Sequence, residues 1–179
     1  MSIVGPRNNA FAVWITGLPA SGKSTITAAL KAQLADRGVD LAVLESDVLR
    51  KVFASDRQYE TKGRDAFYRQ MVFIGSLLLE HGVPVIFDAT ANRRAYRDRA
   101  RREIARFIEV YVDVPLATCT ARDPKGIYRS AGSGEATNVP GVQDPYEPPE
   151  APEVVVQGEN PESDARRIVE KLIEKGYLK

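Results

Sequence analysis

The chain has 179 residues, and its 25 basic and 24 acidic side chains give a net charge of +1. This balance argues against a general nucleic-acid-binding surface, and no stretch is long and apolar enough to span a membrane. Cys119 is the only cysteine, so an intramolecular disulfide is excluded and a reducing compartment fits. We therefore expect one domain over residues 1–179, located in the cytoplasm, with no nucleic-acid or membrane partner.

A glycine-rich loop follows the first predicted strand. The apolar run 11–17 predicts the strand, and Ile26, Leu30 and Leu34 recur at helical spacing after the loop until Gly38. A G-x-x-x-x-G-K-S loop between a strand and a helix turns backbone N–H groups toward phosphate oxygens, and the positive end of the helix adds to this field. The sequence therefore predicts that a nucleoside triphosphate is bound by Gly17, Leu18, Pro19, Ala20, Ser21, Gly22, Lys23, Ser24 and Thr25.

Two side chains of this loop carry the expected chemistry. The Lys23 ammonium can bridge the outer phosphates, which makes it a candidate catalytic residue as well as a binding one. The Ser24 hydroxyl can take one position around a Mg²⁺ ion. We therefore expect the triphosphate to bind together with Mg²⁺.

The second apolar run, 39–45, is followed by Asp47 and, one turn later, by Arg50. An aspartate beside a bound triphosphate can accept a proton from an attacking hydroxyl, and an arginine one turn away can grip an anionic substrate. Asp47 is therefore a candidate catalytic base and substrate ligand. The alternative is that it only caps the next helix.

The third predicted strand, 83–88, ends in Asp88 and follows a helical stripe formed by Phe67, Met71, Ile74 and Leu78. An acid directly after a buried strand resembles the one that orders the Mg²⁺ shell in phosphate-loop enzymes. Ser24 and Asp88 are therefore the expected metal ligands. Two alternatives stay open for Asp88: it is a cap or turn residue, or it replaces Asp47 as the catalytic base.

A third helix is predicted over residues 93–105, where Asp98 and Glu103 interrupt a run of arginines. Such a charge-rich pattern is typical of a solvated helix face. We therefore expect solvent around most members of the run, which are Arg93, Arg94, Arg97, Arg99, Arg101 and Arg102.

Residues 132–153 hold five of the chain's eleven prolines and are not expected to form regular structure. Arg122 and Lys125 lie shortly before this segment, on a stretch suited to a lid that closes over phosphates and excludes water. We expect the lid and substrate loop to cover about 122–152.

Strand and helix signals alternate along the whole chain, with strands predicted at 11–17, 39–45, 83–88, 106–113 and 153–157 and a last helix at 162–175. Strands separated by helices need crossover connections, which give a mainly parallel sheet covered on both faces. We therefore expect an α/β fold of the P-loop nucleoside triphosphate hydrolase type. It would be a three-layer α/β/α sandwich with a five-stranded sheet and ligands at the carboxyl ends of the strands.

Three segments resemble the adenylylsulfate (APS) kinase family, and the resemblance runs through nearly the whole chain. They are GLPASGKST at 17–25, RDPKGIY at 122–128 and DPYEPPEAPE at 144–153. This family transfers the γ-phosphate of ATP to the 3′-hydroxyl of adenosine 5′-phosphosulfate. The resemblance implies an ATP-dependent kinase for a small nucleotide acceptor, and a homodimer.

The resemblance also implies roles for individual residues. In the family, the residues that match Asp47, Arg50 and Arg64 belong to the nucleotide substrate site, and the first two support the transfer. The lid residues matching Arg122 and Lys125 are expected to cover ATP and to contact the acceptor, respectively.

Three positions depart from the family pattern. Phe67 stands where the family has an asparagine, Ala91 where it has a serine, and Val139 where it has a phenylalanine that stacks on the substrate. All three positions lie on the acceptor side, so we expect Phe67 and Val139 to be part of the acceptor site.

These departures leave the acceptor open. APS is the leading candidate, and the alternative is another nucleotide-linked or small phosphorylated metabolite, which the absence of the lid phenylalanine favours. The segments 46–50 and 88–90 also resemble a wider group of small P-loop kinases in which the aspartate matching Asp47 is the general base. A non-catalytic nucleotide-binding module is a third hypothesis, but a binding role alone does not need a positioned base.

Overall fold

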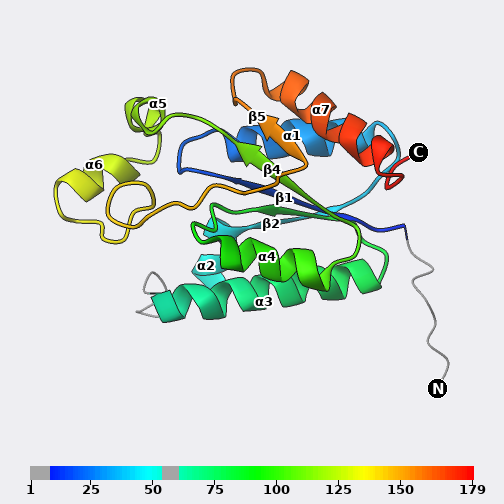
Figure 1. The fold of residues 1–179 in the computed structure, drawn as a ribbon, viewed down its shortest axis with the longest axis horizontal. Coiled ribbons are helices and arrows are strands. Elements are labelled where there is room, and N and C mark those ends of the chain that lie inside the picture. The colour runs from blue at the N-terminus through cyan, green and yellow to red at the C-terminus, as the bar shows by residue number, and fades with distance from the viewer. Residues whose placement is uncertain (1–8, 54–60) are drawn as a thin grey trace.

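The computed structural model describes residues 9–53 and 61–179; the remainder of the predicted domain, 1–8 and 54–60, lies outside the described residues. Five parallel strands form one sheet in the order β2-β3-β1-β4-β5 (Figure 1). The strands are β1 (Ala12–Gly17), β2 (Ala42–Glu45), β3 (Val85–Asp88), β4 (Phe107–Val112) and β5 (Val154–Val156). The predicted parallel five-stranded sheet is confirmed.

Four helices cover the two faces of this sheet, as the alternation of strands and helices predicts. On one face lie α1 (Lys23–Ala35) and α7 (Pro161–Glu174), and on the other lie α3 (Thr61–Glu80) and α4 (Arg94–Glu103) (Figure 1). The three-layer α/β/α arrangement is therefore the expected one.

Each face of the sheet has its own apolar core, because successive side chains of a strand point to opposite faces. Along β1, Val13 and Ile15 face α1 and α7, whereas Trp14 faces α3 and α4. The Trp14 ring stacks on Phe87 of β3 with ring centroids 4.8 Å apart. The completely buried β1 thus anchors the loop that follows it from both sides.

Three short helices lie near the carboxyl edge of the sheet. The first, α2 (Ser46–Val52), follows β2 directly, and α5 (Leu116–Arg122) and α6 (Ile127–Gly132) follow β4. After α6 the chain runs to β5 without a further helix or strand, apart from one isolated bridge between Pro140 and Asp144. The predicted irregular segment 132–153 is confirmed over nearly its whole length.

The expectation of a solvated arginine face on α4 is wrong for Arg97. Its side chain is fully buried and donates to Glu109 of β4 at 2.7 Å, to the carbonyl of Ala91 and to the carbonyl of Glu147. A buried guanidinium is tolerated only when its donors are satisfied, and these partners satisfy them. Arg97 therefore fastens the chain after β3 and the segment before β5 to the sheet.

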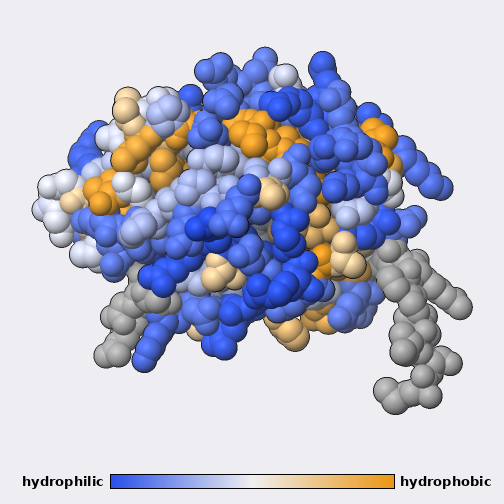
Figure 2. All heavy atoms as spheres, viewed as in Figure 1, coloured by the Kyte–Doolittle hydropathy of each residue, from blue (hydrophilic) through white to orange (hydrophobic). Residues whose placement is uncertain are grey.

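Hydrophilic side chains cover most of the face seen in Figure 2. Within the described residues, no helix has the length and apolarity needed to cross a membrane.

The packing of α3 on β3 gives a first prediction. A Cβ atom at Gly75 would overlap the Phe87 ring, which β3 and Trp14 hold in place. We expect Gly75→Ala to lower the free energy of unfolding by about 1–2 kcal/mol, since overpacking outweighs the better helix propensity of alanine. Urea denaturation measures this change.

The matched control is Gly132→Ala on α6, where a Cβ atom meets nothing within 4 Å. Its free energy of unfolding should stay within about 0.5 kcal/mol of the parent protein. Equal effects of the two substitutions would contradict the packing explanation.

Candidate active site

The loop after β1 needs glycine at two positions. A Cβ atom at Gly17 would lie 2.7 Å from the carbonyl oxygen of Val112 on β4. Gly22 is the amino-terminal cap of α1, and its φ of +100° lies in the left-handed region. Only glycine meets both demands without strain. These two residues set the curvature that places the loop and the amino end of α1 at the carboxyl edge of the sheet.

Lys23 folds back over this loop. Its Nζ atom donates to the carbonyl oxygens of Gly17, at 3.1 Å, and Leu18, at 2.8 Å. Burial lowers the pKa of Lys23 from 10.5 to about 8, although the carboxylates of Asp88 and Asp47 act in the opposite direction. Burial thus leaves the charged form of Lys23 poorly solvated, so an anion bound in the loop would stabilise it strongly.

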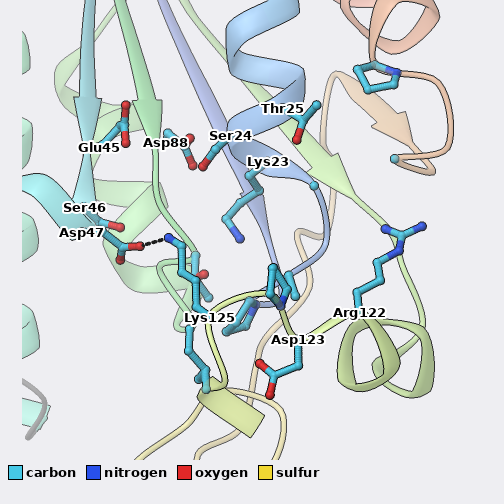
Figure 3. A pocket seen from close by; sticks show the side chains of 18 of the residues that line it. Lys23, Ser24, Thr25, Glu45, Ser46, Asp47, Asp88, Arg122, Asp123 and Lys125 are labelled. Atoms are coloured by element: carbon cyan, nitrogen blue, oxygen red, sulfur yellow. Dashed lines mark hydrogen bonds and ion pairs between the residues drawn. The ribbon is translucent and has the colours of Figure 1, made fainter. Parts of the chain in front are cut away.

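A first cavity of about 400 Å³ opens over the loop. Most of the predicted triphosphate ligands line it, namely Pro19, Ala20, Gly22, Lys23, Ser24, Thr25 and Arg122. The other three predicted ligands, Gly17, Leu18 and Ser21, do not line this cavity. Figure 3 shows Lys23 pointing into this space from the start of α1, with Arg122 and Lys125 on opposite sides of it.

Asp88 is buried at the end of β3, where it accepts a hydrogen bond from the Thr27 hydroxyl of α1 at 3.2 Å. Ser24 and Asp88 both line the first cavity, and their oxygen atoms turn toward each other (Figure 3). Over residues 9–53 and 61–179 there is no cluster of three or more His, Cys, Asp or Glu side chains that could hold a metal ion. Any ion here would therefore need oxygen atoms from a ligand as well.

A second cavity, of about 480 Å³, adjoins the first and shares lining residues of α2 and the lid with it. It is lined by the predicted acceptor ligands Asp47, Arg50, Arg64, Lys125 and Val139. Several polar residues that were not predicted from the sequence also line it, including Tyr68, Thr90, Asn92 and Asn138. Two of these could have been found from their position after β3, where parallel sheets place ligands.

Arg64 already has protein partners in this cavity. Its guanidinium forms an ion pair with Asp144 and donates to the carbonyl of Asn138 and, at 3.3 Å, to the Asn92 side chain. Asn92 in turn donates to Asp144 and to the carbonyl of Pro145, both at 3.0 Å. Arg64 therefore ties α3 to the segment before β5 while it lines the cavity.

Of the three departing positions, Val139 and Phe67 were expected in the acceptor site, and they differ in their placement. Val139 is buried and lines the second cavity. Phe67 is also buried, yet it lines neither cavity; its ring lies against the Arg50 guanidinium, 3.9 Å from the ring centroid. In this arrangement Phe67 would not contact an acceptor in the second cavity directly.

Asp47 and Lys125 stand at the border of the two cavities and line both. The Lys125 Nζ atom donates to the Asp47 carboxylate at 2.5 Å, and both side chains are largely exposed (Figure 3). Asp47 is the second residue of α2, whose amino-terminal cap is Glu45. The Asp47 carboxylate accepts from Lys125 of the lid, and the side chain of the cap residue Glu45 makes no capping hydrogen bond to α2.

The lid itself is fastened at its base. The Asp123 carboxylate accepts from the backbone N–H groups of Tyr128, at 3.2 Å, and Arg129, at 3.0 Å, which holds the turn into α6. The Tyr128 hydroxyl donates to the Pro19 carbonyl at 2.9 Å, and burial raises the pKa of this tyrosine. The lid is therefore connected directly to the loop after β1.

The lowered pKa of Lys23 gives a prediction for ATP binding. Because bound phosphates favour the ammonium form, the dissociation constant should rise above pH 8, by up to about tenfold per pH unit. Titration calorimetry between pH 7 and pH 9.5 measures it. Lys23→Ala should bind more weakly with no such slope, and an equal slope in both proteins would contradict the assignment.

Comparison with known proteins agrees with this geometry. The sequence pattern of the family described as adenylylsulphate kinase matches residues 9–157. An adenylyl-sulfate kinase from Microcystis aeruginosa is 40% identical over 168 residues, which cover 93% of each chain. One from Halothermothrix orenii is 36% identical over 93% of this chain and 91% of its own.

Solved structures agree as well. The Mycobacterium tuberculosis APS kinase in complex with AMPPNP and APS has a TM-score of 0.88 and 30% identity, over 93% of this chain and 99% of its own. A hexameric APS kinase from Thiobacillus denitrificans has a TM-score of 0.70 and 27% identity, over 97% of this chain and 30% of its own. With its loop after β1, its lid and its two adjoining cavities, this chain belongs to the adenylylsulphate kinase family.

Proposed function

We propose that this chain is an ATP-dependent kinase that transfers the γ-phosphate of ATP to the 3′-hydroxyl of adenosine 5′-phosphosulfate. The observation that carries the proposal is the pair of adjoining cavities, one over the phosphate-binding loop and one beside Arg50 and Arg64, with Asp47 at their border. The identity of the acceptor is inferred from the relatives that are named adenylyl-sulfate kinase.

In the proposed reaction Asp47 is the general base. Its carboxylate takes the proton of the 3′-hydroxyl while that oxygen forms a bond to the γ-phosphorus. The bond between the γ-phosphorus and the oxygen that bridges to the β-phosphate breaks, and ADP leaves with the electron pair. Lys125 must release Asp47 during this step, because an ammonium that donates to the carboxylate makes it a poorer proton acceptor.

The loop of residues 17–25 holds the triphosphate, with Lys23 on the outer phosphates and Arg122 over the nucleotide. Such positioning and charge stabilisation supply most of the catalysis in phosphoryl transfer. Lys23 moves from the carbonyls of Gly17 and Leu18 to the phosphate oxygens when ATP binds. Binding of the anion would return the lowered pKa of Lys23 toward its ordinary value.

The donor set fits a Mg²⁺ ion. Ser24 and Asp88 present hard oxygen atoms that turn toward each other in the first cavity, and oxygen is the ligand type that Mg²⁺ prefers. Magnesium bound there with the phosphate oxygens would offset their negative charge. Thr27 keeps the Asp88 carboxylate in place through its hydrogen bond.

The acceptor occupies the second cavity. Arg50 and Arg64 give it a positive wall suited to the phosphosulfate group, and Val139 forms part of the apolar side. The lid, whose Lys125 lines both cavities, would exclude water during the transfer, so that ATP is not hydrolysed instead.

The organisation of the chain and its assembly belong to the same proposal. It consists of one kinase domain over residues 1–179, with the lid and substrate loop at about 122–152. It acts in the cytoplasm, where its single cysteine, Cys119, stays reduced. A homodimer remains the predicted assembly.

Release of ADP tests the acceptor. With ATP and Mg²⁺, addition of APS should raise the rate of ADP release several-fold over ATP alone, in a coupled assay that includes a panel of nucleotide-linked acceptors. Stimulation by another acceptor but not by APS would contradict the proposed substrate and support a changed acceptor. Tight ATP binding without any stimulated turnover would instead support a binding module.

The general base is tested by Asp47→Asn. We expect kcat to fall by about 10²–10⁴-fold while ATP affinity stays nearly unchanged, because the amide keeps the shape but cannot accept the proton. Asp40→Asn, at an exposed position before β2, is the matched control and should keep full activity. Retained activity in Asp47→Asn would transfer the role to Asp88.

A further inference from the structure

Arg50 lies with its guanidinium against an aromatic platform, which consists of the Phe67 and Tyr68 rings. Its guanidinium carbon lies 3.9 Å from the centroid of the Phe67 ring and 5.6 Å from that of Tyr68. Arg50 belongs to α2 and the two aromatic residues to α3, so the contact joins two helices that the chain connects through residues outside the described ranges. Arg50 and Phe67 are both buried.

Within the platform, Phe67 is the residue that does not line the acceptor cavity. Arg50 and Tyr68 line the second cavity, whereas Phe67 lines neither cavity. Arg50 is also absent from the wall of the first cavity. A change at Phe67 can therefore reach a ligand in the second cavity through Arg50, and it has no such route to the triphosphate.

The Phe67 ring is itself held in place. It packs edge-on against Tyr68, with ring centroids 5.2 Å apart, and Tyr68 stacks on Tyr96 of α4 at 4.7 Å. The Tyr68 hydroxyl accepts from the backbone N–H of Ala91 at 3.1 Å. This aromatic row extends into the apolar core under α3 and α4, so the platform moves only if the core moves.

Stacking uses the face of a guanidinium, while its N–H bonds lie in the plane and point outward. An arginine side chain has several rotatable bonds, and a π-face beneath it restricts the positions that the charge can take. An aliphatic residue in place of Phe67 would fill the space but would not attract the charge. The ring thus orients Arg50 before any ligand arrives.

We propose that Phe67 is a positioning residue, which holds the Arg50 guanidinium toward the second cavity and thereby sets the affinity for an anionic acceptor. The proposal rests on the function assigned above, and it names a residue that acts through Arg50 without touching the acceptor.

Three variants test the proposal: Phe67→Leu, which keeps apolar volume without the π-face; Phe67→Tyr, which keeps the ring; and Phe73→Leu, at an exposed position on the same helix. In the ADP-release assay, Phe67→Leu should raise KM for APS by about 2- to 30-fold and leave KM for ATP unchanged. Phe67→Tyr and Phe73→Leu should keep the parent value.

A second readout does not depend on turnover. Protons next to an aromatic face are shifted upfield, so the side-chain NMR signals of Arg50 should be upfield in the parent protein and in Phe67→Tyr. They should move toward ordinary arginine positions in Phe67→Leu. An unchanged Arg50 signal in Phe67→Leu would overturn the proposal.

The kinetic outcomes separate the two proposals. If APS stimulates the parent protein and KM for APS is the same in Phe67→Leu, or KM for both substrates rises equally, the positioning role is refuted while the kinase function stands. If APS does not stimulate the parent protein, the function fails, and a role of Phe67 in APS affinity fails with it.

Discussion

The pairing of β3 between β1 and β2 is the constraint on which the site depends. In the parallel register Asp88 of β3 lies beside Ile15 of β1 on one side and Glu45 of β2 on the other. Strands β2 and β3 therefore end level with each other, β1 runs on to Gly17, and the residues that follow all three strands meet at one edge of the sheet. This register brings together the loop after β1, Asp88 and the α2 residue Asp47. The hydrogen bond from Thr27 to Asp88 then locks α1 to the same edge.

The two cavities at this edge are built in part from different elements of the fold. The first is built on the strand ends and the amino end of α1, so its geometry follows from the sheet. The second has the lid and the segment before β5 as its walls, and these have little regular structure of their own. Ion pairs and hydrogen bonds replace that structure: Arg64 reaches Asp144, and Tyr128 reaches Pro19. In the proposed function the acceptor would therefore contact the lid, because lid residues such as Lys125 line the second cavity.

The elements of the fold and the triphosphate loop could be predicted because their signals are local, as in the motif at 17–25 and the periodicity of the helices. The acceptor side could be predicted only in part. Arg97 is buried with Glu109 and two backbone carbonyls as its partners, so the prediction from its charge that solvent surrounds it was wrong. The ion pair between Lys125 and Asp47 joins residues 78 positions apart, and no local pattern contains it. Phe67 was expected in the acceptor site, but the packing of α2 on α3 turns its ring toward Arg50 instead.

The central claim is that phosphate passes from the first cavity to the second beside Asp47. The most direct measurement is a crystal structure of this protein with a non-hydrolysable ATP analogue and APS bound together. We predict that the analogue's phosphates lie in the loop of residues 17–25. The 3′-hydroxyl of APS should lie within hydrogen-bond distance of the Asp47 carboxylate, and Lys125 should have turned away from it. An APS ribose bound in the second cavity but remote from Asp47 would contradict the claim.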